Sequence, residues 1–157
     1  MRILTVRQPW AWAIIHGGKN VENRTQRWSY RGPLAIHAGQ RWSYRGGFSP
    51  LVIDAARRAG LGDWAAHDGQ GILRPSAPLS LPAGAIIGVV DLVDIHTAEQ
   101  GCCDSPWAEY LPPDPWATPP RRVTHLVLTN QRPVEPIPCR GALGLWTVPD
   151  HLTGDLT

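Results

Sequence analysis

The sequence predicts an α+β fold, with a small barrel-like sheet of about six mixed strands and flanking helices. Three observations support this. Several short segments are rich in β-branched residues and alternate between apolar and polar positions, as strands do. Two other segments carry apolar residues at helical spacing. The chain has 157 residues, of which 43% are hydrophobic, and this length fits one domain with a real core.

The first forty residues predict strand, helix, strand and strand in that order. Residues 2–6 alternate and form the first expected strand. Pro9 then opens a helix at a position where its missing N–H costs nothing, and Gly17-Gly18 ends that helix after about two turns. Residues 21–25 and 33–38 are the next two expected strands.

The rest of the chain predicts a loop, one more helix and three more strands. Residues 39–50 are expected to form a loop. Apolar residues at helical spacing over 51–56 predict a helix, which is expected to end at Gly60. The further strands are expected at 85–95, 123–129 and 143–148. Two further segments are expected to be loop-like insertions in a single domain spanning 1–157. The segment 61–82 is rich in Gly, Pro and Ser, and the segment 97–122 is rich in Pro.

Composition argues against a membrane protein. The longest apolar run, near residues 85–90, is far too short to span a bilayer. The first ten residues lack the small-residue cleavage site of a signal peptide. We therefore expect a cytoplasmic protein without a membrane partner, present as a monomer or weak dimer.

The cysteines do not predict a disulfide framework. The chain has an odd number of cysteines, namely Cys102, Cys103 and Cys139, and it shows no secretion signal. Together with His96 and His125 they can be imagined as a zinc site, but the spacing matches neither CxxC nor HxxxH. The sequence therefore predicts unliganded thiols, no metal and no cofactor.

Charge is distributed unevenly along the chain. Residues 1–48 contain seven Arg and one Lys against one acid, a net charge of +7, whereas residues 49–157 contain seven Arg against twelve acids, a net charge of −5. A basic first third favours an anionic partner for one face of the protein. Since Arg outnumbers Lys fourteen to one, the arginines are a weaker signal than Lys19, the single lysine.

One hexapeptide occurs twice. The sequence Arg-Trp-Ser-Tyr-Arg-Gly fills residues 27–32 and again 41–46, on either side of the strand expected at 33–38. It can reflect local duplication alone. Alternatively, the copies form two Arg/aromatic loops on one side of the sheet, where aromatic rings stack on bases and guanidinium groups hold phosphates of single-stranded RNA.

Three neighbouring segments contain the candidate site residues. Gln8 and Pro9 mark the junction of a strand and a helix, where unpaired N–H groups favour anions. Lys19, Glu22 and Arg24 follow around the strand expected at 21–25. Lys19 and Glu22 can form a plain ion pair, or Lys19 can bind an anionic or carbonyl group or serve as a catalytic amine.

The combination of separated motifs resembles the ASCH domain, a relative of the PUA RNA-binding fold. The resemblance covers most of the chain, outside the two insertions. It rests on Gln8-Pro9-Trp10, Lys19-x-x-Glu22-Asn23-Arg24, Arg31-Gly32, Ile36-His37-Ala38, Ala85 to Asp91, Ile137-Pro138-Cys139-Arg140-Gly141 and Gly144-Leu145-Trp146.

The resemblance implies a PUA-like β-barrel with a cleft for RNA or a modified nucleoside. Some ASCH relatives hydrolyse acetylated cytidine, others are ribonucleases, and others bind nucleic acid. In the amidohydrolase pattern a Thr follows the Lys by three positions, and an acid lies on a later strand. Lys19 and Asp91 match the Lys and the acid, but Glu22 replaces the Thr. A carboxylate cannot act as a hydroxyl nucleophile, so Glu22 is expected to orient Lys19 or to act as a general base on water.

The leading hypothesis is binding of RNA or a nucleotide through a basic, Trp-lined cleft. The expected ligand-binding residues are Gln8, Pro9, Trp10, Arg24, His37 and Arg140, although a histidine at such a strand end, like His37, more often has a structural role. The alternative is a hydrolase acting on an acylated nucleoside or on RNA, with Lys19, Glu22 and Asp91 as catalytic residues. A third hypothesis is a protein-interaction module that uses the proline-rich segment 106–120.

Overall fold

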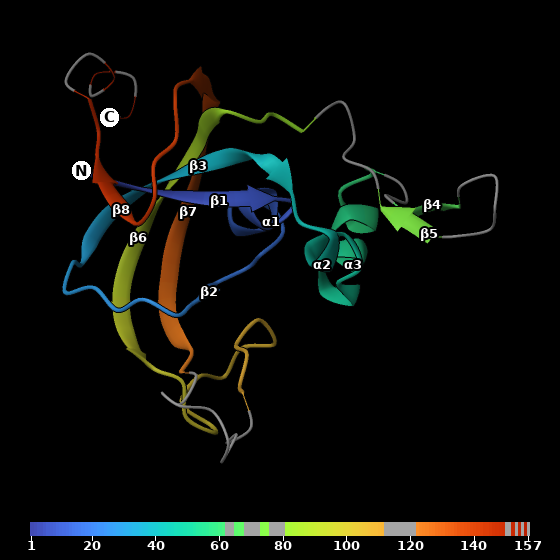
Figure 1. Ribbon diagram of the computed structural model, residues 1–157, viewed down its shortest axis with the longest axis horizontal. Helices are drawn as coiled ribbons and strands as arrows, with labels where there is room; N and C mark the ends of the chain where they lie inside the picture. The colour runs from blue at the N-terminus through green and yellow to red at the C-terminus, as the bar shows by residue number, and fades with distance from the viewer. Residues whose placement is uncertain are drawn as a thin grey trace.

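A mixed six-stranded sheet forms the centre of the protein in the computed structural model, which describes residues 1–61, 65–67, 73–75, 81–111, 122–149, 152, 154 and 156 (Figure 1). The strand order is β2-β7-β6-β3-β1-β8. β1 and β3 are parallel, and the other neighbouring strands are antiparallel. The six strands are β1 (Arg2–Gln8), β2 (Val21–Arg24), β3 (Gly32–Trp42), β6 (Ala85–Thr97), β7 (Thr124–Pro138) and β8 (Leu145–Thr147). This confirms the α+β class and the mixed sheet.

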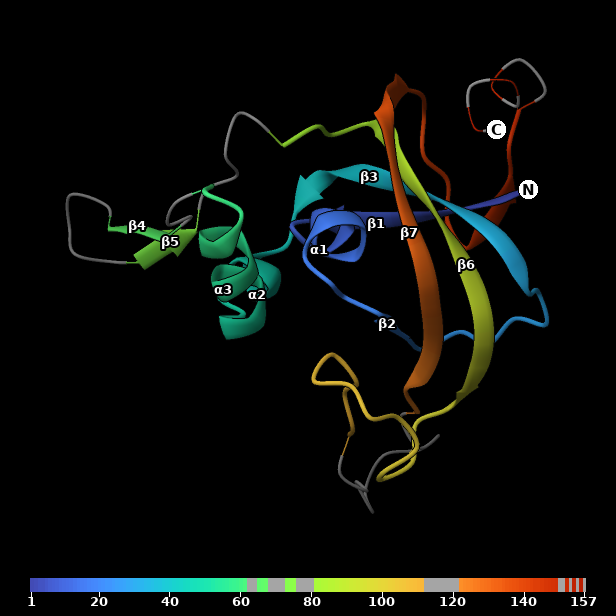
Figure 2. The same ribbon diagram turned by 180° about the vertical axis from the view of Figure 1, so that it is seen from behind.

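The sheet is not closed into a barrel. β2 and β8 are its two edge strands, and within the described part of the chain they do not pair with each other. β6 and β7 are long and strongly curved, which gives the sheet a barrel-like outline in Figures 1 and 2. The closed barrel expected from the sequence is therefore not confirmed, because a barrel requires hydrogen bonds between the two edge strands.

Three helices accompany the sheet in the part of the chain that the structure describes. α1 (Trp10–His16) and α3 (Pro50–Arg58) confirm the two expected helices, and α2 (Tyr44–Gly47) is an addition. The expectation of a loop at 39–50 is wrong, since β3 continues to Trp42 beside the end of β1 and Ser43 then caps α2 by accepting a hydrogen bond from the Gly46 amide. A two-stranded hairpin, β4 (Ala65–His67) and β5 (Leu73–Pro75), lies beside α2 and α3 within the first insertion (Figure 2).

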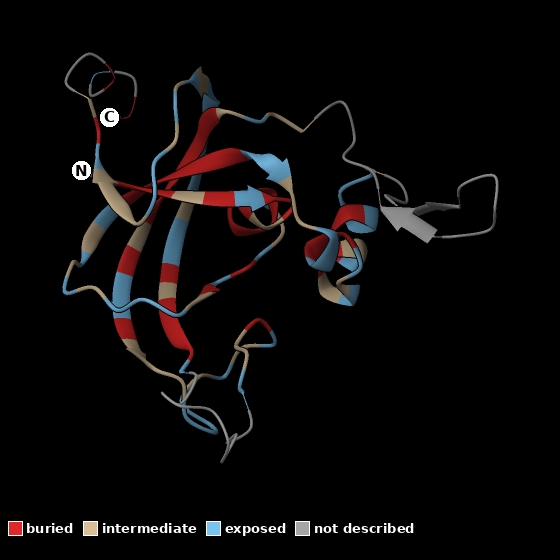
Figure 3. Cartoon of the chain, in the orientation of Figure 1, coloured by how far each residue is buried: buried red, intermediate tan, exposed pale blue. Residues whose placement is uncertain are grey.

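Each face of the sheet contributes residues to a buried cluster, because alternate residues of each strand point to opposite sides. On one side, α1 packs against β1, β3, β6 and β7, and Leu4, Ile14 and Leu34 belong to the same buried cluster. On the other side, Ile3 and Ile86 pack with Val148 and the residues that follow β8. Figure 3 shows the resulting bands of buried and exposed residues along β6 and β7. This packing fixes β1 as a rigid wall for the site described below.

One glycine allows α1 to lie close to the sheet. A Cβ atom at Gly88 in β6 would lie 2.5 Å from Cδ1 of Ile15 and 2.8 Å from the carbonyl oxygen of Arg132. Only glycine lets the backbone of β6 and the side chain of Ile15 approach this closely.

The loop after β6 remains near the sheet over its described residues, 98–111, which contain neither helix nor strand. These residues fall within the segment 97–122 that the sequence predicts to be an insertion, and residues 112–121 of that segment lie outside the described residues. None of the described helices has both the length and the apolar character that a bilayer span needs.

Candidate functional site

The main cavity lies between β1, β2, the start of α1, α2 and four connecting segments. Its volume is about 440 Å³, within the range of about 300–1,000 Å³ that is common for small-molecule sites. It is lined by Thr5, Val6, Arg7, Trp10, Lys19, Glu22, Asn23, Arg24, Ser43, Arg45, Glu109, Ala142, Leu143 and Gly144. Four of these side chains are basic and two are acidic, so the lining carries a net charge of +2.

Lys19 lies at the base of this cavity with an exposed fraction of only 2%. The chain leaves α1 through Gly18, whose φ of +74° is in the left-handed region, and the Lys19 amide donates to the carbonyl oxygen of Ala13 over 2.9 Å. The ammonium group lies 5.5 Å from the ring centroid of Trp10 and 5.8 Å from that of Trp107. Two indole rings therefore stabilise the buried cation.

A buried ion-pair network joins Lys19 to Glu22 and Arg24. Lys19 Nζ is 3.1 Å from one carboxylate oxygen of Glu22, and Arg24 Nε is 2.9 Å from the other. Lys19 also donates to the carbonyl oxygen of Val21, and the Arg24 guanidinium donates to the carbonyl oxygen of Thr5 over 2.9 Å. Both oxygens of Glu22 are thus engaged, an arrangement that suits a positioning carboxylate better than a free general base.

Trp10 forms a fixed wall of the same cavity. Its indole N–H donates to Ser43 Oγ over 3.0 Å. A Cβ atom at Gly46 would lie 2.9 Å from two atoms of this ring, so α2 packs directly against the indole. Ser43 and Arg45, which also line the cavity, belong to the second copy of the hexapeptide.

The loop between β6 and β7 closes the cavity from a further side. Glu109 lines the cavity and forms an ion pair with Arg45 over 2.6 Å. Asn23 in β2 holds this loop, because its side chain donates to the carbonyl oxygen of Trp107 over 2.9 Å and accepts from the Glu109 amide over 3.0 Å.

The structure brings Lys19, Glu22, Trp10 and Arg24 together as expected, but it places Asp91 elsewhere. Asp91 lies in β6, where its carboxylate accepts a hydrogen bond from Asn130 over 2.8 Å and pairs with Arg132 over 3.4 Å. The Asn130 hydrogen bond, and then Arg132, lower the pKa of Asp91 despite the opposing effect of desolvation. The described residues that line the cavity do not include Asp91.

Two of the expected ligand-binding residues have structural contacts instead. Gln8 is buried, its side-chain oxygen accepts from the Trp12 amide over 2.9 Å, and its side-chain nitrogen donates to the Pro82 carbonyl oxygen. In the first turn of the seven-residue helix α1, the Gln8 side chain therefore satisfies one amide, that of Trp12. Pro9 is buried under α2, next to Gly46.

His37 and Arg140 also lie outside the cavity lining. His37 is buried, its Nε2 is 3.0 Å from the carbonyl oxygen of Cys139, and its ring contacts Trp146 edge to face. Desolvation lowers the pKa of His37, and the Cys139 contact only partly opposes this. Arg140 is exposed, two residues before Ala142 on the cavity rim.

The two copies of the hexapeptide adopt different structures at opposite ends of β3. In the first copy, Tyr30 donates to the Pro33 carbonyl oxygen, and Gly32 starts β3 with a φ of +118°. In the second copy, Ser43 to Gly46 enter α2. The expected pair of loops on one side of the sheet is therefore wrong, and only the second copy contributes to the main cavity.

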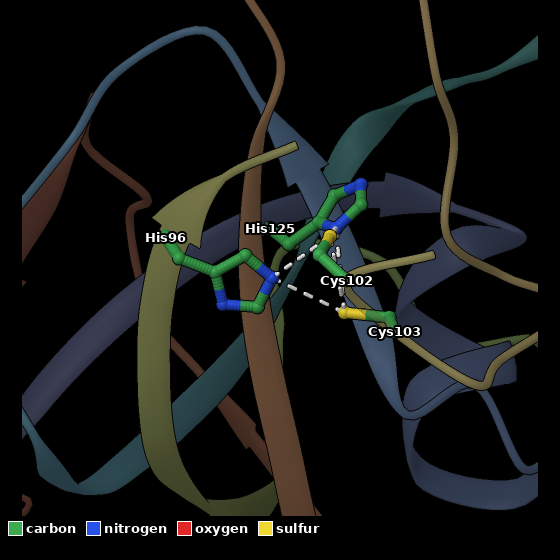
Figure 4. A group of neighbouring side chains, drawn as sticks. All are labelled: His96, Cys102, Cys103 and His125. Atoms are coloured by element: carbon green, nitrogen blue, oxygen red, sulfur yellow. Dashed lines mark hydrogen bonds between the residues drawn. The ribbon is translucent and has the colours of Figure 1, made fainter. Parts of the chain in front are cut away.

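A second polar cluster lies beyond the cavity, near the end of β6 and the start of β7 (Figure 4). It contains His96, Cys102, Cys103 and His125, whose candidate ligand atoms all lie within 4.8 Å of one another. Of the described residues, these form the one group that could hold a metal ion. Although burial opposes it, hydrogen bonds from the Glu99 amide and from His96 lower the pKa of Cys102 to about 6.

Sequence reasoning missed Asn23, Ser43, Arg45 and Glu109 as cavity residues. The repeated hexapeptide does contain Ser43 and Arg45, but it predicted a pair of loops on one side of the sheet and not the lining of this cavity. Glu109 had no local signal, because its position depends on contacts with Asn23 and Arg45, 86 and 64 residues away in the chain.

Comparison with known proteins assigns the family. The model of the ASCH domain matches residues 4–137. The chain belongs to the ASCH domain family. Similar solved structures include the ASCH protein of Zymomonas mobilis, with 14% identity and a TM-score of 0.52, covering 98% of this chain and 91% of that one.

Two point mutants of the Zymomonas mobilis protein are similar to the same degree. A tyrosine-to-phenylalanine mutant has 13% identity and a TM-score of 0.55, with coverage of 98% and 93%. A serine-to-alanine mutant has 13% identity and a TM-score of 0.55, with coverage of 98% and 91%. At this identity the likeness shows the ASCH fold alone. A search of curated proteins finds no match.

Proposed function

We propose that this ASCH protein binds single-stranded RNA by taking one nucleotide unit into the cavity at Lys19. The observation that carries the proposal is a cavity of nucleotide-compatible size with a net positive lining, a buried ammonium at its base and a fixed indole in its wall. Cationic side chains hold phosphates, and aromatic rings provide apolar surface for bases.

Lys19 is suited to contact the ligand. An ammonium group has three N–H donors, and the described partners of Lys19 are two, the Val21 carbonyl oxygen and Glu22. Because Glu22 and the two indoles fix the ammonium, a third donor can meet a phosphate or carbonyl oxygen without further ordering.

Arg7 and Arg45 are the exposed cations of the cavity. Because both are exposed, they can contact phosphates of the strand outside the cavity, and Arg45 can exchange its Glu109 partner for a phosphate. The proposed role of both is phosphate contact, which contributes affinity that salt weakens.

The test is a titration of fluorescently labelled single-stranded RNA at two salt concentrations. Binding should weaken as salt rises, and Arg45→Gln should reduce the slope of log affinity against log salt by about 0.7 for the phosphate contact it removes. Arg58→Gln is the matched control, since Arg58 lies on α3 outside the cavity lining and pairs with Asp54. Absence of binding at low salt, or binding that salt does not change, would refute the proposal.

A hydrolase is the second candidate, because Lys19 and Glu22 do lie side by side in the cavity. Its catalytic set would be these two residues, without Asp91. Purified protein is incubated with acetylcytidine and with RNA oligomers, and products are separated by chromatography. Turnover that persists in a folded Lys19→Met variant would exclude Lys19 as its catalytic amine.

A further inference from the structure

The His96, Cys102, Cys103 and His125 cluster is assembled by the pairing of β6 with β7. His96 near the end of β6 lies directly opposite His125 near the start of β7 in the antiparallel register. The loop that joins the two strands returns Cys102 and Cys103 to the same point (Figure 4). Residues up to 29 positions apart in the chain thus converge, although their spacing resembles no common zinc motif.

Five of the six distances between the four ligand atoms lie within about 0.4 Å of those of a tetrahedral zinc site. Cys102 Sγ and Cys103 Sγ are 3.9 Å apart. His96 Nε2 is 3.2 Å from each sulfur, and His125 Nδ1 is 3.3 Å from Cys102 Sγ and 3.4 Å from Cys103 Sγ. Tetrahedral Zn²⁺, with Zn–S of about 2.3 Å and Zn–N of about 2.05 Å, requires roughly 3.8 Å between sulfurs and 3.6 Å between sulfur and nitrogen.

The outer nitrogens of both imidazole rings have the partners that metal-bound histidines usually have. His96 Nδ1 is 2.6 Å from the Asp94 carboxylate, and His125 Nε2 is 2.9 Å from the carbonyl oxygen of Glu109. With a proton on each of these outer nitrogens, the inner nitrogens face the two sulfurs with free lone pairs. Carboxylate and carbonyl partners of this kind orient ligand histidines.

A disulfide does not explain the cluster. The 3.9 Å between the vicinal sulfurs is far from the length of about 2.05 Å of an S–S bond, and both cysteines are free thiols. The Glu99 amide also donates to Cys102 Sγ over 3.4 Å, a contact that stabilises a thiolate.

We propose that His96, Cys102, Cys103 and His125 bind one Zn²⁺ ion. Two thiolates and two neutral imidazoles balance the charge of the ion, and this soft donor set favours zinc over magnesium or calcium. Binding replaces each S–H bond by an S–Zn bond, and protons held by the thiols pass to solvent. Four protein ligands fill a tetrahedral shell, so the ion is structural rather than catalytic. This departs from the unliganded thiols expected from the sequence.

The zinc site would fix the loop that forms one wall of the main cavity. Glu109, whose carbonyl oxygen contacts the His125 ring, also lines that cavity, and Trp107 lies beside the Lys19 ammonium. The ion therefore anchors residues 102–109 at one end while Asn23 holds them at the other. This consequence rests on the proposed function, whereas zinc binding itself does not.

The first test measures metal in the full chain after expression with zinc and extensive dialysis. Mass spectrometry of the metal content should give about one zinc per chain. Cys103→Ser should lose it, and Cys139→Ser, the matched control at the third cysteine, should keep it. Zinc-free folded protein, or a Cys102–Cys103 disulfide in its place, would overturn the proposal.

The second test does not depend on the folding of a ligand variant. Cobalt(II) is added to metal-free wild-type protein, and the predicted spectrum has the strong visible bands of tetrahedral cobalt and a thiolate charge-transfer band. Asp94→Asn should weaken zinc binding by about 10–100-fold, as loss of a partner of a ligand histidine does. Asp91→Asn, on the same strand, should leave zinc affinity unchanged. The weak pink spectrum of octahedral cobalt, or equal effects of the two variants, would contradict the assignment.

Discussion

Replacement of Glu22 by Gln removes the charge that balances Lys19 in the protein interior. The side chain of Lys19 is only 3% exposed, and that of Glu22 only 9%. At the observed 3.1 Å separation, the attraction between the two charges is about 5 kcal/mol for an effective dielectric constant of about 20. Arg24, with 30% of its side chain exposed, is solvated by water after the change to a far greater extent than Lys19, with 3% exposed.

Removing one partner of a buried ion pair lowers the free energy of unfolding by about 3–5 kcal/mol, because the other charge remains buried without a counterion. We therefore expect Glu22→Gln to lower the free energy of unfolding by about 3–5 kcal/mol. For a chain of this size, this corresponds to a decrease in Tm of roughly 10 °C or more. Urea denaturation followed by circular dichroism measures the first quantity, and thermal denaturation the second.

The matched control is Asp54→Asn, which breaks an exposed ion pair on α3. The side chains of Asp54 and Arg58 are 64% and 66% exposed, so this change should cost less than about 0.5 kcal/mol. The double variant Lys19→Met/Glu22→Leu removes both buried charges and should be more stable than Glu22→Gln alone. If Glu22→Gln costs no more than Asp54→Asn, the reasoning about the buried network is wrong.

Three further variants test other contacts. Burial lowers the pKa of His37 below its value in the unfolded chain, so the unfolded chain binds a proton more readily, and the free energy of unfolding should fall as the pH decreases through the unfolded pKa of about 6.5. His37→Gln should flatten this decline in denaturation curves recorded across that pH range. An unchanged decline would exclude His37 as its source. Gly88→Ala should lower the free energy of unfolding by about 1–3 kcal/mol in urea, since the new Cβ overlaps Ile15 and the Arg132 carbonyl; a neutral result would show that β6 and α1 can separate freely. Trp10→Phe removes the donor to Ser43 and should cost about 0.5–1.5 kcal/mol in the same assay, whereas no change would mean that this hydrogen bond does not hold the cavity wall.

Strands with strong local patterns could be predicted from the sequence, and β7 shows where this fails. Its first half alternates and was expected, but residues 130–138 include three prolines and continue the strand. β2 pairs only with residues 124–127, so the second half of β7 has β6 as its single described neighbour. This half of β7 is therefore an edge strand, where proline is tolerated more readily than in a strand with neighbours on both sides.

The repeat shows that an identical sequence does not ensure an identical local structure. Residues 27–32 connect β2 to β3, whereas 41–46 end β3 and enter α2. Trp10 bonds to Ser43 and packs against Gly46, and these contacts exist only for the second copy. The difference is therefore tertiary and could not be predicted from the hexapeptide.

The candidate site was predictable where its residues are close in the chain. Lys19 and Glu22 are three positions apart, and Glu22 and Arg24 share one face of β2, so their network follows from local spacing. The convergence of the His96, Cys102, Cys103 and His125 cluster depends on the register of β6 and β7. A search for short motifs cannot reveal a site that strand pairing assembles.

The proposal that RNA enters the cavity at Lys19 is tested most directly by the tryptophan side-chain N–H signals in NMR spectra during titration with single-stranded RNA. Trp10 lines the cavity, whereas Trp28 lies in the first hexapeptide at the other end of β3. Trp10→Phe and Trp28→Phe assign the two signals. The account predicts that the Trp10 signal shifts progressively while the Trp28 signal stays in place. A shift of Trp28 with an unchanged Trp10 would contradict it.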